Sequence, residues 1–323
     1  MRILFAGSPA IAVPALQVLS RMELDGKGVV LAGLLTNQDS KKGRGKNEEP
    51  TDVSAAASEL DKERKGLPPI VQLKPEKLDA GARDDVAALA PELLVSFACG
   101  HFFGPRFLAL FPLGGINIHP SLLPKYRGAC PIPAAILGRD KEMGICIQRL
   151  ASELDSGDIL AMERFELSCR ETTSSLSETV AGKAASLLEN LLLNFDESLK
   201  NARPQNGEAV YCKEIKKEEG LIDWTLSALE IDAQIRAYTP WPLSFTSLGD
   251  KTLFILEGQP LAFPERQCDA PGTVLGTDNN YGLLVQTGDG ILAVTRLQWQ
   301  AKKALDWKAF CNGTRDFIGR KLG

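Results

Sequence analysis

Residues 114–128 read Gly-Gly-Ile-Asn-Ile-His-Pro-Ser-Leu-Leu-Pro-Lys-Tyr-Arg-Gly, and this stretch decides how the first part of the chain folds. It opens as a short apolar strand, which we expect to run from Gly115 to His119. Because side chains alternate along a strand, Asn117 and His119 should lie on one face and Ile118 on the other. Prolines at positions 120 and 124 follow at once. The stretch therefore predicts a polar pair at a strand end, presented to a loop-lined cleft.

Around this strand the chain alternates short apolar runs with helical patterns, which is typical of a parallel sheet covered by helices. The expected strands are 3–6, 29–35, 70–71, 93–98, 115–119, 144–150 and 159–167, and the expected helices are 14–22, 52–65, 80–89, 107–110 and 172–199. This pattern predicts an α/β, Rossmann-like domain with a mostly parallel sheet. Ligands of such sheets bind beyond the carboxyl ends of the strands, which is where Asn117 and His119 lie. The first strand-to-helix turn, Gly7-Ser8-Pro9, lacks the Gly-x-Gly-x-x-Gly pattern, so no nicotinamide or flavin site is expected.

The second part of the chain has a different texture. Residues 201–208 have the polar composition of a linker, with Pro204 and Gly207. Beyond them come one expected helix and several short β-rich runs broken by Gly, Pro and Asp: 226–238, then 244–248, 252–257, 272–275, 282–287 and 291–299. Many short strands with turn signals indicate a small barrel. The predicted organisation is a catalytic domain over 1–200, a linker over 201–208 and a small OB-like β-barrel domain over 209–323.

The composition is that of an ordinary globular protein, with 44% hydrophobic and 24% charged residues among 323. No apolar run approaches the roughly 18 to 20 residues that a membrane helix needs. The first residues lack the features of a signal peptide, so we expect a cytoplasmic protein with no membrane partner. Seven cysteines include no Cys-x-x-Cys pair, which argues against a disulfide framework and against a structural zinc site.

The net charge of −4 argues against a general nucleic-acid binder, but bases are concentrated locally. Between residues 37 and 46 four bases accompany the single acid Asp39: Lys41, Lys42, Arg44 and Lys46. From residue 293 onward seven bases stand against two acids. Such patches suit a polyanion that is held at chosen places. They are equally typical of a solvated surface, and composition leaves both interpretations open.

The candidate chemistry rests on three polar residues. The chain has only two histidines, His101 and His119, and Asp155 lies in the sequence Leu-Asp-Ser-Gly-Asp. Asn117 and His119 would stabilise a carbonyl oxygen that gains negative charge, while Asp155 would orient the imidazole, raise its pKa and relay protons. No Ser or Cys stands in a nucleophile-elbow motif, which favours direct transfer to an amine, and ligand-spaced His and Cys for a metal are absent. A structural alternative stays open, in which Asn117 and His119 cap the backbone and Asp155 forms an Asx turn.

Several motifs together carry a family resemblance. They are Asn117-Ile-His-Pro-Ser-Leu-Leu-Pro124, Asp155-x-Gly-x-Ile159, Lys125-Tyr-Arg-Gly-Ala-Cys-Pro-Ile132, Phe5-Ala-Gly-Ser-Pro9 and Gly43-Arg-Gly-Lys46, with Ile222-Asp-Trp224, Ile235-Arg-Ala-Tyr-Thr-Pro-Trp-Pro242, Ala270-Pro-Gly-Thr273 and Thr287-Gly-Asp-Gly290 in the second part. Through them the chain resembles the folate-dependent formyltransferases over nearly its whole length. The motifs of the second part resemble the branch of that family that acts on methionyl initiator tRNA.

The resemblance implies that the chain transfers the formyl group of 10-formyltetrahydrofolate to the free amino group of methionyl initiator tRNA, which starts translation. It implies three groups of site residues: a catalytic set of Asn117, His119 and Asp155, folate contacts from Ser121, Leu122, Leu123 and Pro124, and contacts to the tRNA acceptor stem from Lys41, Lys42, Arg44 and Lys46. It also implies that the barrel holds the tRNA backbone. We expect a monomer without a metal.

Two alternatives share parts of the pattern. A sugar-nucleotide N-formyltransferase would share the first domain and its three polar residues, but not the basic loop or the Trp241-Pro242 motif. A non-enzymatic tRNA- or folate-binding protein would share the fold alone. Three departures from the family pattern concern folate affinity and loop detail: Cys99 in place of the usual Tyr, His101 in place of an apolar residue, and the missing proline near Asn37.

Overall fold

The computed structural model describes residues 1–41, 48–261, 269–314 and 316–323. Contacts within the chain divide it into two compact units that interleave in sequence. The first comprises Met1–Gly128, Glu142–Glu166 and Ser177–Tyr211, and the second comprises Ala129–Lys141, Leu167–Leu176 and Cys212–Gly323. The predicted catalytic domain over 1–200, linker over 201–208 and barrel domain over 209–323 assign tasks to parts of the chain, and this assignment stays a prediction.

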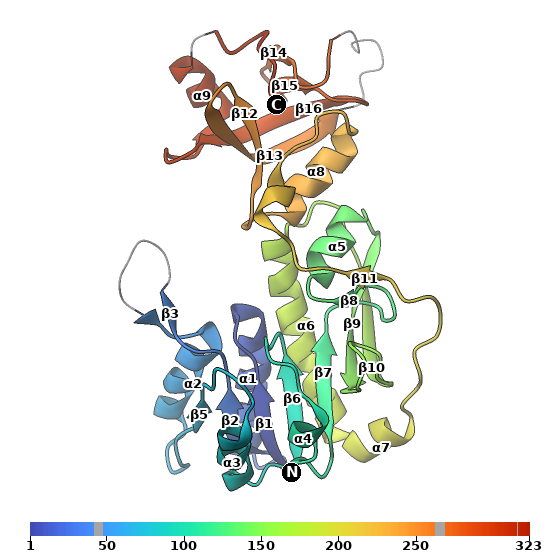
Figure 1. Ribbon diagram of the computed structural model, residues 1–323. Helices are drawn as coiled ribbons and strands as arrows, with labels where there is room; N and C mark the ends of the chain where they lie inside the picture. The colour runs from blue at the N-terminus through green and yellow to red at the C-terminus, as the bar shows by residue number, and fades with distance from the viewer. Residues whose placement is uncertain (42–47, 262–268, 315) are drawn as a thin grey trace. The chain divides into compact units, whose positions relative to one another are not determined.

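The first unit is built on a seven-stranded sheet in the order β10-β9-β7-β6-β1-β2-β5 (Figure 1). Its strands are β1 (Arg2–Ala6), β2 (Val30–Leu35), β5 (Gln72–Leu73), β6 (Leu93–Phe97), β7 (Gly115–His119), β9 (Glu142–Arg149) and β10 (Ile159–Glu166). The neighbouring strands from β7 to β5 pair in parallel, β9 runs antiparallel to β7, and β10 runs antiparallel to β9. The α/β domain with a mostly parallel sheet is therefore confirmed. The strand expected at 70–71 lies instead at Gln72–Leu73.

Helices pack against this sheet as the alternating pattern predicts. They are α1 (Val13–Leu24), α2 (Asp52–Glu63), α3 (Ala80–Ala88), α4 (Pro105–Leu108), α6 (Thr173–Leu193) and α7 (Phe195–Lys200). Val86 of α3 and Phe107 of α4 are buried in one cluster with Leu4 and Leu94 of the sheet. An ion pair of 2.8 Å joins Glu189 of α6 to Arg21 of α1.

The single long helix predicted over 172–199 is wrong. It is interrupted at Asn194, whose φ of −123° and ψ of 35° lie outside the helical region. The Asn194 side chain donates a hydrogen bond to the carbonyl of Asn190, and asparagine competes for backbone groups in this way. Two acids, Asp196 and Glu197, occupy the first turn of the helix that follows, where the helix dipole favours them.

The second unit contains an antiparallel sheet in the order β12-β13-β16-β15-β14, with β17 beside β16. Its elements are β12 (Ser244–Leu248), β13 (Lys251–Leu261), β14 (Val274–Asp278), β15 (Gly282–Gln286), β16 (Ile291–Trp299) and β17 (Leu305–Asp306), with α5 (Pro131–Leu137), α8 (Ala228–Ala237) and α9 (Trp307–Gly313). One face of the strands buries Leu253, Val285 and Val294 together with Ile231 and Phe310 of the helices.

Residues 320–323 join the two edges of this sheet. The amide of Val274 on β14 donates to the carbonyl of Arg320, and the amide of Leu322 donates to the carbonyl of Gly272. On the other side, the amide of Gly323 donates to the carbonyl of Ser247 on β12. Closing a small sheet in this way covers edge strands that would otherwise be open. The sheet has the barrel-like closure that the sequence predicts.

Candidate active site

Asn117 and His119 lie at the carboxyl end of β7, between β6 and β9. In the register of these strands Asn117 is paired with Ser96 and Gln148, and His119 is paired with Cys146. His119 is 4% exposed, whereas Asn117 is half-buried and more accessible. The structure thus places both side chains where the strand pattern predicts, at the end of a central strand.

Asp155 is brought to this strand end by a tight turn between β9 and β10. Its φ of 49° lies in the left-handed region, which Asp tolerates better than most residues. Gly157 allows the turn to lie close to β9, because a Cβ at this position would be 1.9 Å from the carbonyl oxygen of Arg149. The Asp-x-Gly spacing is therefore explained by the shape of the turn, whatever the carboxylate does.

The Asp155 carboxylate faces the other two members of the predicted catalytic set, Asn117 and His119. Its Oδ1 accepts hydrogen bonds from Gln148 Nε2 at 2.9 Å and from Asn117 Nδ2 at 3.5 Å. Its Oδ2 accepts from the amide of Gly128 at 2.9 Å and lies 3.6 Å from His119 Nδ1. Residues far apart in sequence are thus collected around one carboxylate. Their catalytic role is not decided by this proximity and stays a prediction.

The imidazole of His119 is held on two sides. Its Nε2 lies 2.8 Å from the carbonyl oxygen of Tyr126, so Nε2 carries the hydrogen and donates it. Burial lowers the pKa of His119, while the Asp155 charge and the Tyr126 carbonyl act in the opposite direction. The expected rise of the pKa is therefore not the net result, because desolvation outweighs the carboxylate. In the neutral ring, Nδ1 presents a lone pair to Asp155, and a proton gained at Nδ1 would turn that contact into an ion pair.

The predicted folate loop, Ser121–Pro124, follows directly after β7. Ser121 and Leu123 point inward and are 1% and 5% exposed, and Ser121 Oγ donates to the carbonyl of Lys125 at 2.6 Å. Leu122 is half-buried and packs over Gly144, where an added Cβ would be 2.2 Å from its Cδ2. Pro124 is also half-buried. Leu122 and Pro124 are thus the side chains of this loop that keep accessible surface.

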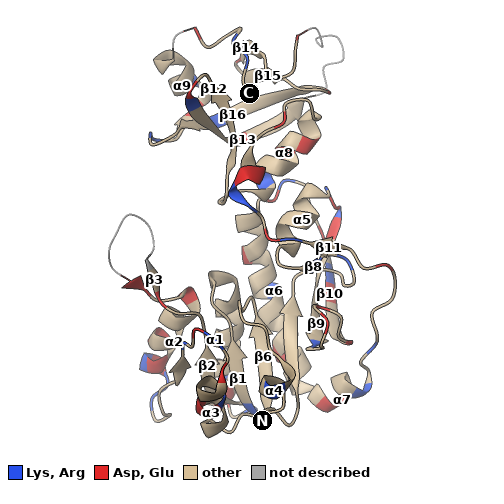
Figure 2. Ribbon diagram, in the orientation of Figure 1, with Lys and Arg blue, Asp and Glu red and all other residues tan. Residues whose placement is uncertain are grey.

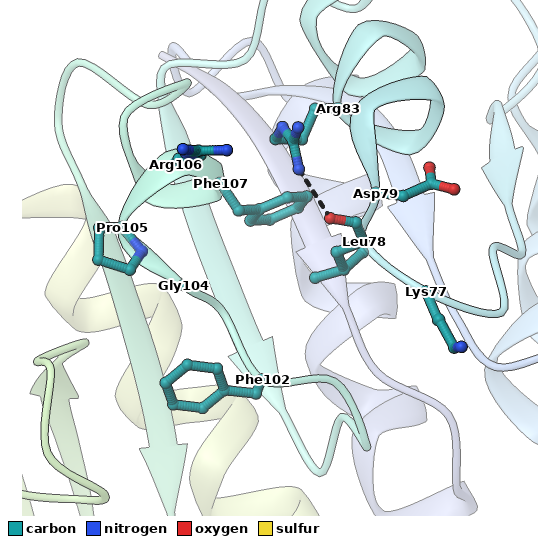
Figure 3. Close-up of a pocket in the computed structure, with 9 residues that line it drawn as sticks. All are labelled: Lys77, Leu78, Asp79, Arg83, Phe102, Gly104, Pro105, Arg106 and Phe107. Carbon is teal, nitrogen blue, oxygen red and sulfur yellow. Dashed lines mark hydrogen bonds between the residues drawn. The ribbon is translucent and has the colours of Figure 1, made fainter.

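A cavity of about 590 Å³ lies elsewhere in the first unit (Figure 3). Its lining comes from the segments around α3 and α4: Lys77, Leu78, Asp79, Arg83, Phe102, Gly104, Pro105, Arg106 and Phe107. Phe102 is 71% exposed, while Phe107 belongs to the core beneath. None of the predicted catalytic or folate residues is among these lining residues. The cavity therefore does not test the assignment of the active site.

The predicted tRNA contacts fall largely outside the described residues. Lys42, Arg44 and Lys46 belong to the undescribed segment 42–47. Lys41 is at the end of the short strand β3 (Ser40–Lys41), which pairs with β4 (Glu48–Glu49). Figure 2 shows basic residues interspersed with acidic ones along both units, in keeping with the small net charge.

Two residues around Asp155 were not anticipated from the sequence. Gln148 and Gln205 hold the Asp155 turn, and the signal for Gln148 was its place on the strand beside β7. Cys99 and His101, two of the departures from the family pattern, are both half-buried. Burial raises the pKa of Cys99 to about 11, and His101 Nε2 is buried without a hydrogen-bond partner in the described structure.

The described residues include neither a metal-ligand cluster nor a membrane-spanning helix. No group of three or more His, Cys, Asp and Glu side chains in the described part of the chain is arranged to hold a metal ion. None of the helices in the described ranges is both long and apolar enough to span a lipid bilayer.

Comparison with known proteins identifies the family. Residues 1–192 match the formyl transferase family, and residues 214–315 match the formyl transferase C-terminal domain. The methionyl-tRNA formyltransferase of Treponema denticola is 49% identical over 98% of both chains, and that of Treponema pallidum is 40% identical over 100% of this chain and 99% of the relative. The chain belongs to the formyl transferase family, in the branch of the methionyl-tRNA formyltransferases.

A solved structure shares the fold at low identity. A sugar 3N-formyltransferase, crystallised in the presence of dTDP and 5-N-formyl-THF, superposes with a TM-score of 0.61 and 17% sequence identity. The similarity covers 94% of this chain and 99% of that protein. At this identity the likeness shows the fold and does not transfer the substrate.

Proposed function

We propose that the chain transfers the formyl group of 10-formyltetrahydrofolate to the amino group of methionyl initiator tRNA. The observation that carries the proposal is the convergence of Asn117 and His119 on the Asp155 carboxylate at the end of β7, with Asn117 Nδ2 at 3.5 Å and His119 Nδ1 at 3.6 Å from its oxygens. Full-length relatives named methionyl-tRNA formyltransferase support the same substrate pair. The product would serve translation initiation, and we expect the enzyme to act as a cytoplasmic monomer.

Within this function each side chain has a separate task. Asn117 donates one amide hydrogen to Asp155, which leaves its second hydrogen to stabilise negative charge on a carbonyl oxygen. His119 and Asp155 form the pair that accepts the proton lost by the attacking amine, because Asp155 stabilises the imidazole in its protonated form. The formyl donor would supply the activated carbonyl group. Ser121, Leu122, Leu123 and Pro124 would hold it from the loop beside His119.

The two parts of the chain would divide the substrates between them. We assign formyl transfer and folate binding to residues 1–200, the connection to 201–208, and tRNA-backbone binding to 209–323. The bases Lys41, Lys42, Arg44 and Lys46 would contact the acceptor stem, since arginine and lysine pair with phosphate. The match of residues 214–315 to the C-terminal formyl transferase domain supports a separate task for the second part.

A formylation assay separates this function from its main alternative. Purified protein is incubated with 10-formyltetrahydrofolate and one of three acceptors: methionyl initiator tRNA, methionyl elongator tRNA or an amino-sugar nucleotide. We expect formylated product with the initiator tRNA. Product with the sugar nucleotide alone would replace the proposal with a sugar formyltransferase, and no product with any acceptor would leave only a binding protein.

A further inference from the structure

Gln205 lies in the segment predicted as a linker, but its side chain reaches the Asp155 turn. Its Nε2 donates to the carbonyl oxygens of Asp155 at 2.8 Å and of Gly157 at 2.9 Å, and lies 3.1 Å from Gln148 Oε1. Its Oε1 accepts from Nη2 and Nε of Arg127, at 2.7 and 3.0 Å. One side chain thus joins the loop after β7 to the turn that carries the candidate carboxylate.

The position of Gln205 is fixed by the backbone on either side of it. The amide and carbonyl of Arg203 exchange hydrogen bonds with the carbonyl and amide of Ile159, at 3.0 and 2.8 Å. Further along, the amide of Val210 donates to the carbonyl of Pro124. The segment 203–210 is therefore laid across the active-site loops and is not a free tether.

Glutamine suits this position because it both donates and accepts. The turn offers carbonyl oxygens, which need a donor, while Arg127 offers N–H groups, which need an acceptor. A carboxylate could satisfy Arg127 but would face the carbonyls of Asp155 and Gly157 with a second acceptor. The turn is also bound to β9, where the Arg149 amide donates to the Asp158 carbonyl at 2.9 Å. The turn is thus held by hydrogen bonds to Gln205 and to β9.

We propose that Gln205 is a positioning residue for the reaction, which keeps the Asp155 carboxylate aimed at His119 and Asn117. The inference rests on the proposed function, since it gives Gln205 its importance through Asp155. The hydrogen bonds run without a break from Arg127 to Gln205, to Gln148, and from Gln148 Nε2 to Asp155 Oδ1. Gln148 is 1% exposed, so it cannot replace a lost partner with water easily.

The test compares Gln205→Ala and Gln205→Glu with the matched control Asn206→Ala, an exposed neighbour in the same segment. We expect both Gln205 variants to lower kcat by about 10- to 100-fold, because misplacing a reacting group by about 1 Å has an effect of this order. The KM values for the folate and for the tRNA should stay within about twofold. Asn206→Ala should behave as the wild type. Thermal melting of each variant verifies that it is folded.

Gln205→Glu distinguishes positioning from simple tethering. It keeps an acceptor for Arg127 but loses the donor to the Asp155 and Gly157 carbonyls. A tether through Arg127 would leave this variant near the wild-type kcat, and that result would overturn the inference. Unchanged kcat in Gln205→Ala would overturn it as well.

A second readout does not depend on formyl transfer. The chain has only two histidines, so the imidazole of His119 can be followed by NMR and assigned with a His101→Asn variant. The pKa of His119 should move in Gln205→Ala in the same direction as in Asp155→Asn, because both take the carboxylate charge away from Nδ1. An unmoved His119 pKa in Gln205→Ala contradicts the positioning role. Normal turnover in Asp155→Asn would instead contradict the catalytic assignment in the proposed function, whatever Gln205 does.

Discussion

Replacing Asp155 with asparagine tests the candidate site most directly, because it keeps the size of the side chain and removes its charge. Both carboxylate oxygens are used as acceptors: Oδ1 by Gln148 and Oδ2 by the amide of Gly128. An asparagine can satisfy one of these donors and must turn its own N–H₂ group toward the other. We therefore expect Asp155→Asn to lose stability as well as turnover, by about 1 to 3 kcal/mol for the unpaired donor.

The loss of turnover follows from the contact with His119. Two unit charges 3.6 Å apart interact by about 4 to 5 kcal/mol at an effective dielectric constant of about 20. Because three donors already stabilise the carboxylate charge, we take a somewhat smaller interaction of about 3 to 4 kcal/mol with the protonated imidazole. Because about 1.4 kcal/mol corresponds to a factor of ten, kcat should fall by about 100- to 1000-fold.

The measurement is a single-turnover formylation rate at saturating initiator tRNA, as a function of pH. Without the Asp155 charge the pKa of His119 falls further below its ordinary value, so the acid limb of the profile should move to lower pH. The matched control is Asp158→Asn, an exposed aspartate of the same turn, which should retain the wild-type rate. An Asp155→Asn profile that overlays the wild type would reduce Asp155 to a turn residue and refute the reasoning.

Three further predictions concern neighbouring features of the same site. His119→Ala and Asn117→Ala should each lower kcat by about 100-fold or more, as loss of one oxyanion donor typically does; if His101→Ala proved the more damaging histidine change, the wrong imidazole would have been chosen. Gly157→Ala should lower both kcat and thermal stability, because its Cβ would lie 1.9 Å from the Arg149 carbonyl oxygen. A crystal structure of this variant in which the turn keeps its wild-type position would contradict that account. The free energy of unfolding should fall as the pH decreases below 6.5, the ordinary pKa of histidine, because the pKa of buried His119 is lowered and the unfolded chain then binds more protons than the folded one. Denaturant titrations at several pH values should show a smaller decrease of this free energy with falling pH in His119→Asn than in the wild type. An equal decrease would mean that His119 does not titrate differently in the folded protein.

The strand end could be predicted from the sequence because its determinants are local. The alternation of apolar and polar residues over Gly115–His119 fixes which side chains share a face, and Pro120 marks where the strand ends. The same logic located most strands and helices of both units. It failed at Asn194, where one polar side chain bonds to the backbone and interrupts a pattern that is otherwise continuous.

The surroundings of Asp155 could not be predicted in the same way. Its place beside His119 depends on the antiparallel register of β7 with β9, and on a turn whose left-handed residue leaves no periodic signal. The family resemblance supplied Asp155, but not Gln148 and Gln205, which form hydrogen bonds with it. Gln205 lies 50 residues from Asp155 and was assigned to a linker on composition, because polar residues near proline and glycine look alike whether they are free or bound.

The environment of His119 explains why a buried imidazole and a carboxylate need each other here. Burial alone disfavours the charged ring, and the pKa of His119 is lowered accordingly. A neutral imidazole at rest has Nδ1 available as a proton acceptor, while Nε2 is occupied by the Tyr126 carbonyl. Acceptance of a proton would be too costly in such a site unless a negative group stood ready, and Asp155 lies 3.6 Å from Nδ1. Within the proposed function, the geometry therefore favours His119 as the acceptor of the amine proton and leaves Asn117 as the donor to the formyl oxygen.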